Sequence, residues 1–484
     1  MSRSEAPRAC RAQCGGSAAG LKEIAAAAAV AAFLIAAAPL HSATVIWDGG
    51  AGTGAWGTGT NWSTNVVPAT TDSLVFNAAA ANNQYAITLG GNRTAAGVSF
   101  SNAAGTNAFT FSGNTLTINA GGITNNDELT QTFSSAVTVN SAQTWTAMGG
   151  LAFTNVTLSS NLTQSGTANI SIGGTLTNSG GSRTITNNTA GTATINNINL
   201  SNNATNRTLT LGGTGNTTVT GVISNNLSSA SNLTKTGSGT LTLSGANTYT
   251  GATNVNAGTL RLGANNVLSN STAVTVASGA TLNLNNYSDT IGSLAGAGIV
   301  TLGSGTLTVG ANNTSTTFSG SFAAGDTGTF AKTGTGTLTF GAGMDLSGGT
   351  LQLSGGTLNL GGFSSTFGAL NVTGNSILDF GSSGSSVLNI INSLTISSGV
   401  TLTIANWTNA VDYFYSLTNP GASLGRIVFT GFTSGDTKWL PYDHQVTPVP
   451  EPSLYGAVLI GAALALAGHH RWRRRSSSTP ERPD

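Results

Sequence analysis

Histidine, cysteine and paired carboxylates are the side chains from which a catalytic site is most often built, and this chain of 484 residues holds few of them. Its histidines and cysteines all fall at or near the two ends of the chain: His41, His444, His469, His470, Cys10 and Cys14. Chemistry of the serine–histidine–aspartate kind would have to use His444. A solvated histidine in a linker rich in proline and aspartate is the favoured interpretation of that residue.

Carboxylates and lysines do not form a catalytic pattern either. Asp127-Glu128 is the only adjacent acidic pair, and an exposed turn explains it better than a glycosidase carboxylate does. The aspartates that a polysaccharide lyase would cluster are scattered along the chain: Asp289, Asp326, Asp345 and Asp379. Lys235 and Lys332 occupy equivalent repeat positions, which favours a repeat feature over a base. The sequence therefore predicts no catalytic, cofactor-binding or metal-ligating residue.

Charge is sparse in the body of the chain. Residues 44–448 carry 8 Lys and Arg against 11 Asp and Glu, a net charge near −3. A nucleic-acid partner needs a basic stripe, so that class of partner is excluded. With 66 glycines and much Thr, Ser and Asn, the composition fits either a flexible stalk or a β-structure with dense turns.

Strict alternation decides between these two possibilities. Thr and Asn alternate with aliphatic residues in four short runs: 240–243, 281–284, 306–309 and 357–360. Period two is the pattern of a strand with one buried face, which a disordered stalk has no reason to keep. Gly, Asn and Ser between the runs supply turn conformations. An all-β fold is predicted.

These strands recur as a repeat. The clearest unit spans 233–263, LTKTGSGTLTLSGANTYTGATNVNAGTLRLG, and a degenerate copy spans 330–361. The unit resembles the autotransporter-associated β-strand repeat. One repeat cannot bury its apolar face alone, so stacked coils of about 20 residues are expected, as in a β-solenoid, or parallel β-helix. No membrane β-barrel pattern follows, so the resemblance does not imply that the chain carries its own translocator.

Aromatic residues gather at the two ends of the expected solenoid. Trp47, Trp56 and Trp62 lie in residues 44–100, which we predict to be an N-terminal cap with the first coils. The solenoid proper is expected over 101–403, and 404–448 is expected to form a C-terminal cap and linker. Capping is required of any solenoid, and platforms for stacking on sugar rings are the alternative.

The first 43 residues indicate export. Arg3, Arg8, Arg11 and Lys22 precede an alanine-rich apolar stretch, and Ser42-Ala43 offers small residues for cleavage. This is the pattern of a secretory signal peptide. Since both cysteines lie within 1–43, the mature chain has no thiol for a disulfide.

The last segment has three parts. Val449, Pro450, Glu451, Pro452 and Ser453 come first, then the apolar run 454–468, then a basic stop at Arg471, Arg473, Arg474 and Arg475. Fifteen helical residues span about 22 Å, less than a hydrocarbon core of about 30 Å, and the arginines favour the cytoplasmic side. The segment 449–475 resembles the PEP-CTERM sorting signal. That resemblance implies a single transmembrane sorting helix, cut by an exosortase-type membrane enzyme, with 476–484 as a cytoplasmic tail.

The expected protein is therefore an exported, non-enzymatic surface or matrix protein with a structural or adhesive role. It would be anchored transiently in the membrane and then reach the cell envelope or the extracellular matrix. Its expected partners are the processing enzyme and, beyond that, extracellular polysaccharide or further copies of itself. The alternative is a β-helix that binds or cleaves glycans.

Overall fold

The computed structural model describes residues 42–77, 81–101, 107–382, 384–432 and 437–449, all within one compact unit. Strand β20 (Thr240–Leu243) shows how the sequence builds it. Leu241 and Leu243 are buried, whereas Thr240 and Thr242 are half-buried on the outer side. The alternation of the sequence thus becomes an inner apolar face and an outer hydroxyl face, as predicted.

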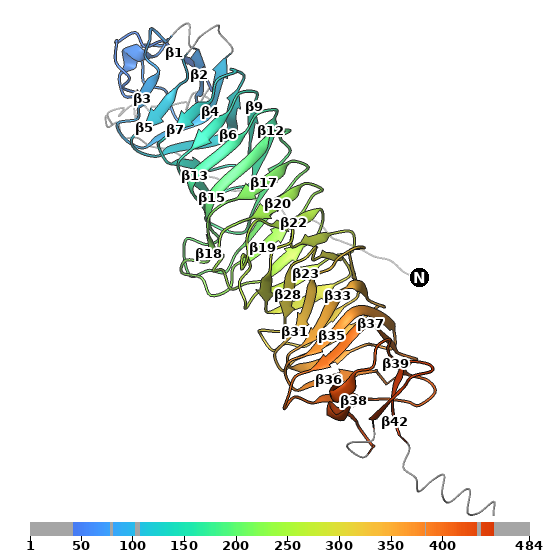
Figure 1. Cartoon of the computed structure of the whole chain (residues 1–484). Coiled ribbons are helices and arrows are strands. Elements are labelled where there is room, and N and C mark those ends of the chain that lie inside the picture. Colours follow the sequence, from blue (N-terminus) through green and yellow to red (C-terminus); the bar gives the residue numbers. More distant parts are fainter. Residues whose placement is uncertain (1–41, 78–80, 102–106, 383, 433–436, 450–484) are drawn as a thin grey trace, which may run out of the picture. The chain divides into compact units, whose positions relative to one another are not determined.

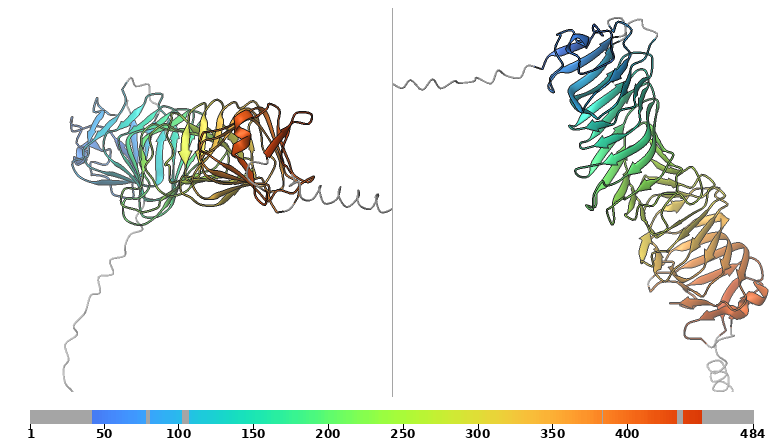
Figure 2. Two further views of the ribbon diagram at one scale, coloured as in Figure 1. Left: turned by 60° about the horizontal axis from the view of Figure 1, so that its bottom comes forward. Right: turned by 90° about the vertical axis from the view of Figure 1, so that its left-hand side faces the viewer.

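Successive coils pair in parallel. Leu241 of β20 lies opposite Leu260 of β22 (Thr259–Leu262), and Leu260 lies opposite Leu282 of β24 (Thr281–Asn283). This stacking continues through about 16 turns and confirms the parallel β-solenoid. Figure 1 shows the strands in chain order along the stack, and both views in Figure 2 show the same order of coils.

The described strands form two sheets, one of 33 strands and one of 9. The larger sheet contains β1 (Thr44–Trp47), β2 (Ser73–Asn77), β3 (Ala86–Thr88), β4 (Arg93–Ser101), β5 (Thr110–Ser112), β6 (Leu116–Asn125), β7 (Gln131–Phe133), β8 (Val137–Val139), β9 (Gln143–Ala147), β10 (Leu151–Phe153), β11 (Val156–Leu158), β12 (Leu162–Gly166), β13 (Ile170–Asn178), β14 (Arg183–Asn187), β15 (Thr192–Asn199), β16 (Thr208–Gly212), β17 (Asn216–Val219), β18 (Ile223–Ser224), β19 (Asn232–Lys235), β20, β21 (Thr253–Val255), β22, β23 (Ala273–Val276), β24, β26 (Ser293–Gly296), β27 (Ile299–Thr301), β29 (Thr316–Phe318), β30 (Ser321–Phe322), β32 (Thr337–Phe340), β34 (Gly356–Asn359), β36 (Ser376–Asp379), β38 (Leu402–Ala405) and β40 (Ile427–Phe429). The smaller sheet contains β25 (Asp289–Ile291), β28 (Thr306–Val309), β31 (Thr329–Lys332), β33 (Asp345–Leu353), β35 (Ser364–Val372), β37 (Val387–Ile396), β39 (Tyr413–Ser416), β41 (Thr437–Leu440) and β42 (Gln445–Pro448).

The first coil is closed by tryptophans. Trp47, Trp56 and Trp62 are each at most 1% exposed, and Trp47 and Trp56 both meet Trp62 edge-on at 5.0 Å between ring centroids. The loop that carries Trp56 and Trp62 includes the 3-10 helix η1 (Gly59–Asn61). These rings are interior, so they do not form an exposed platform for stacking on sugar rings.

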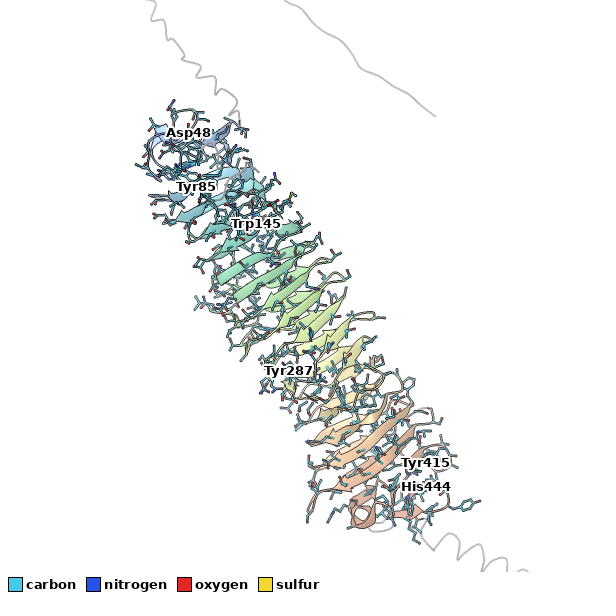
Figure 3. The ribbon with its side chains drawn as sticks, turned by 45° about the horizontal axis from the view of Figure 1, so that its top comes forward. Asp48, Tyr85, Trp145, Tyr287, Tyr415 and His444 are labelled. Carbon is cyan, nitrogen blue, oxygen red and sulfur yellow. The ribbon has the colours of Figure 1, made fainter. Side chains whose placement is uncertain are left out.

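An aromatic stack continues from this end into the next coils, where no second cluster is predicted from the sequence. The rings of Phe111 and Phe133 are parallel at 4.7 Å, and those of Phe133 and Phe153 lie 4.8 Å apart. Trp145 completes the stack at 4.3 Å from Phe153, inside the coils in Figure 3. Phe111, Phe133 and Phe153 therefore occupy equivalent positions of successive coils. Trp145 comes from another strand, and all four rings are fully or almost fully buried.

The other end is closed by a change of strand direction. The hairpin of β41 and β42 is antiparallel, and β42 meets β39 antiparallel through Tyr415 and Gln445. The 3-10 helix η2 (Gly421–Arg426) precedes β40. Trp439 of β41 donates from its indole nitrogen to the carbonyl of Ser416 at 2.8 Å, which fixes the hairpin on the last coil. An antiparallel hairpin leaves no parallel edge for another coil to extend.

Within the described ranges no helix is long and apolar enough to cross a membrane. The predicted sorting helix at 454–468 lies outside those ranges.

Candidate functional site

Four buried aspartates bind main-chain N–H groups of the preceding coil: Asp72, Asp289, Asp326 and Asp412. Asp326 illustrates the arrangement. Its Oδ2 accepts from the Leu302 amide and its Oδ1 from the Gly303 amide, both at 2.8 Å. These amides sit at a coil corner, where no strand partner satisfies them. The carboxylates therefore link one coil to the next and are already occupied as acceptors.

Asp289 is the most strongly perturbed of the acidic groups. Its Oδ2 accepts from the amides of Val267 at 3.0 Å and Leu268 at 2.9 Å. Burial raises the pKa of its carboxyl from 3.8 to about 6, although the hydrogen bonds from Leu268, Val267 and Thr290 act in the opposite direction. The group is 2% exposed, so its role is structural.

Like these aspartates, the two repeat lysines bind main-chain groups at coil corners. The Nζ of Lys235 donates to three carbonyl oxygens: Thr236 at 2.7 Å, Gly237 at 2.8 Å and Ala257 at 3.1 Å. Lys332 donates to the equivalent carbonyls of its own repeat: Thr333 at 2.7 Å, Gly334 at 3.4 Å and Gly355 at 3.4 Å. Burial lowers the pKa of each ammonium to about 8. Both lysines are thus repeat features, as the sequence indicates.

One glycine in each repeat unit, Gly258 and Gly356, is required where the lysine binds the corner carbonyls. Gly258 has φ +67, and a Cβ there would lie 2.4 Å from the Gly237 carbonyl oxygen and 2.8 Å from the Lys235 Nζ. Gly356 has the same φ of +67 and would place a Cβ 2.8 Å from the Lys332 Nζ. Only glycine combines the left-handed backbone with this close approach.

Asparagine side chains at the outer corners accept hydrogen bonds from main-chain amides, as the buried aspartates do inside. Exposed asparagine side chains accept from a backbone amide one coil later, as in three representative pairs: Asn161 Oδ1 with Thr184 N at 3.0 Å, Asn216 Oδ1 with Thr240 N at 3.0 Å, and Asn313 Oδ1 with Thr335 N at 2.9 Å. The high asparagine content is therefore explained by satisfaction of corner amides.

The predicted acidic candidates do not assemble into a hydrolytic pair. Glu128 is exposed, but Asp127 is buried rather than exposed, and it accepts from the amide of Leu129 at 3.2 Å. Asp326 and Asp345 do meet in one hollow of about 190 Å³. Asp345 accepts from the Ser347 amide at 3.0 Å, and the residues that line this hollow include no lysine or arginine. The described residues also contain no group of three or more His, Cys, Asp or Glu that could hold a metal ion.

A further feature is a cleft on the outer side of the smaller sheet at its C-terminal end. It has a volume of about 360 Å³ and is lined by residues of β35, β37, β39 and the turn before β42: Thr366, Asn389, Ile390, Ile391, Tyr415, Leu417, Asp443 and His444. Strand register puts Thr366 opposite Asn389 and Asn389 opposite Tyr415. The floor is thus one row of outward side chains from three consecutive coils.

Tyr415 is the tyrosine that lines this cleft, and Tyr413 stacks beside it on the same strand. Tyr413 and Tyr415 are two residues apart on β39, so both rings face outward. Their planes differ by 2° and their centroids lie 5.7 Å apart. Partial burial, Tyr413 and the negative charge of Asp443 all raise the pKa of the Tyr415 hydroxyl, which keeps it protonated.

His444 belongs to this cleft and not to a solvated linker. It ends the β41–β42 turn with φ 60, is half-buried, and lies 5.8 Å from the Trp439 ring. Its Nδ1 is buried and has no hydrogen-bond partner. Figure 3 shows Tyr415 and His444 next to each other at this end. The sequence interpretation missed this because it placed no hairpin after Thr437.

The predicted sorting residues fall almost entirely outside the described ranges. Val449 is described and follows β42 directly. The other members of the motif, Pro450, Glu451, Pro452 and Ser453, lie beyond it, as do the basic-stop residues Arg471, Arg473, Arg474 and Arg475.

Two segments of the chain match the family model of the passenger-associated transport repeat, at residues 233–262 and 330–360. In each of these two units the repeat lysine donates to the carbonyls of a coil corner. The chain is similar to that repeat over these segments. The match is consistent with the predicted autotransporter-associated β-strand repeats. No curated protein and no solved structure matches the chain.

The cleft was partly readable from sequence. Tyr413-Phe414-Tyr415 has the period-two spacing that places two tyrosines on one face. What the sequence could not supply is the hairpin that brings Asp443 and His444 beside them, because β42 pairs with β39 across an intervening 3-10 helix and two other strands.

Proposed function

We propose that this protein is an exported, non-catalytic surface or matrix protein whose β-solenoid has a structural and adhesive role. Two properties support export: the matched repeat is associated, by its description, with transported passengers, and the first 43 residues have the pattern of a signal peptide. A β-solenoid of this kind fits an autotransporter-like passenger domain.

The structural role is supported by the groups that the buried charged side chains bind. Asp72, Asp289, Asp326, Asp412 and the two repeat lysines are all bound to main-chain groups of a coil corner. Acid–base catalysis needs a titrating group that faces a substrate. Side chains committed to corner amides and carbonyls serve rigidity instead, and the outer surface is left to Thr, Ser and Asn.

We propose further that the tail at 449–475 sorts the protein. The last strand ends at Pro448, one residue before the motif begins at Val449, so a processing enzyme would meet the motif at the boundary of the folded unit. Cleavage near Glu451 by an exosortase-type enzyme would release the solenoid from its transient membrane anchor.

Cell fractionation with mass spectrometry of both protein termini tests this proposal. The expected mature protein begins near Thr44, ends near Glu451 and is found in the envelope or the medium. A Glu451→Ala variant should accumulate as a membrane-held precursor. Wild-type protein intact through Asp484 would contradict processing and leave a plain anchor, and protein retained in the cytoplasm would contradict export.

A further inference from the structure

We propose that the cleft between β35, β37, β39 and the β41–β42 turn binds a neutral pyranose unit of a polysaccharide. This inference rests on the proposed function, since only an exported protein meets such a polymer. It names the ligand class and the place where adhesion occurs.

The size and lining of the cleft suit a single sugar unit. Its volume of about 360 Å³ falls within the range of small-ligand sites, about 300–1,000 Å³. Its apolar surface comes from the Tyr415 ring and from Leu417, which is 53% exposed. A pyranose ring presents an apolar C–H face that aromatic and aliphatic side chains can cover.

Hydrogen-bonding groups stand at the edges of this apolar surface. Asn389 donates to the Thr366 hydroxyl only at 3.4 Å, so its amide retains capacity for a ligand. Asp443 is exposed and accepts from the Gln445 amide at 3.4 Å. His444 also lines the cleft, but its Nδ1 is buried, so this atom does not face a ligand there. An amide and a carboxylate beside an apolar floor are complementary to a ring that carries several hydroxyl groups.

The charged side chains that line the cleft indicate which class of sugar it would bind. Among the described residues that line the cleft, Asp443 is the one charged side chain, and no lysine or arginine is present to bind a carboxylate or sulfate. A uronate or sulfated sugar would meet repulsion there. The row Thr366, Asn389 and Tyr415 runs from coil to coil, which gives a linear polymer a direction in which to continue.

Binding of the purified full chain to neutral oligosaccharides of glucose, mannose and galactose, measured by titration calorimetry, tests the proposal. Tyr415→Ala and Asp443→Ala should each weaken binding about tenfold or more, since they remove the stacking surface and a hydroxyl acceptor. Tyr442→Ala is the matched control: Tyr442 is 100% exposed in the same turn and does not line the cleft. It should bind as the wild type does. Polygalacturonate should not bind in this cleft.

Three results would contradict the proposal that this cleft binds a neutral sugar. These are no binding of any neutral oligosaccharide, equal binding by wild type and both cleft variants, or stronger binding of polygalacturonate that depends on Tyr415. If Tyr415→Ala does not fold, the exposed Asp443→Ala variant decides the outcome alone. Each result is independent of cell fractionation, so an exported protein without this sugar site remains distinguishable from a protein that is not exported.

Discussion

Removing one aspartate that links two coils should lower the local stability of the solenoid. The free-energy cost follows from the main-chain amides that lose their acceptor. Asp326→Ala leaves the amides of Leu302 and Gly303 without their acceptor. An unsatisfied buried amide costs about 1–3 kcal/mol. Since the Gly303 amide is only partly buried and can recruit water, we expect about 2–4 kcal/mol in all. Asp326→Asn keeps one acceptor oxygen, so about 1–3 kcal/mol is expected.

Native-state hydrogen exchange is the appropriate assay, because long repeat arrays do not unfold as one unit. Exchange at Leu302 and Gly303 should accelerate about 30- to 700-fold in Asp326→Ala, at about 1.4 kcal/mol per tenfold. Asp345→Ala is the control, because Asp345 is exposed and holds only the nearby Ser347 amide. Equal exchange in the two alanine variants would refute the idea that the buried carboxylates hold the coils together.

Three further outcomes follow from the packing and electrostatics. Phe133→Ala removes the central ring of the aromatic stack and should cost about 3–5 kcal/mol, measured by native-state hydrogen exchange; a cost below about 1 kcal/mol would mean that the stack contributes little. Gly258→Ala should lower the melting temperature more than Gly279→Ala, since both glycines have positive φ but a Cβ at Gly279 meets nothing within 4 Å; equal melting would disprove the close-approach argument. The folded state holds the Asp289 proton more tightly than the unfolded chain, so this group stabilises the fold below about pH 4 and that contribution is lost as pH rises through about 6. Asp289→Asn should lack this component in stability measured from pH 3.5 to 7, and an unchanged pH slope would count against the raised pKa.

The fold was largely predictable because it depends on local signals that repeat. The period-two runs such as 240–243 predicted strands with one buried face, and β20 has that pattern. The equivalence of Lys235 and Lys332 was also readable, since both stand at the same place in the 233–263 and 330–361 units. The purpose of that equivalence was not readable, because carbonyls of a coil corner converge on Nζ only after the coils have stacked.

Features that depend on contacts between distant segments escaped the sequence argument. Asp127 reads as part of an exposed turn, yet it is buried: its amide donates to Asn125, and Asn125 donates in turn to the Gly150 carbonyl of the next coil. His444 reads as a linker residue, yet a hairpin turns it toward β39. Both errors arise in turns whose burial depends on a neighbouring coil or hairpin, which no periodicity of the sequence marks.

The coil-to-coil bonding also determines how the molecule responds to tension. Each strand of the solenoid interior pairs only with the coil before it and the coil after it, as β20 does with β17 and β22. A pulling force applied to the two chain ends therefore concentrates on the terminal coil, which must detach before its neighbour experiences the load. Extension then proceeds by peeling single coils, each releasing a short length of chain and dissipating work. A solenoid pulled in this way lengthens in steps while the remaining coils stay folded.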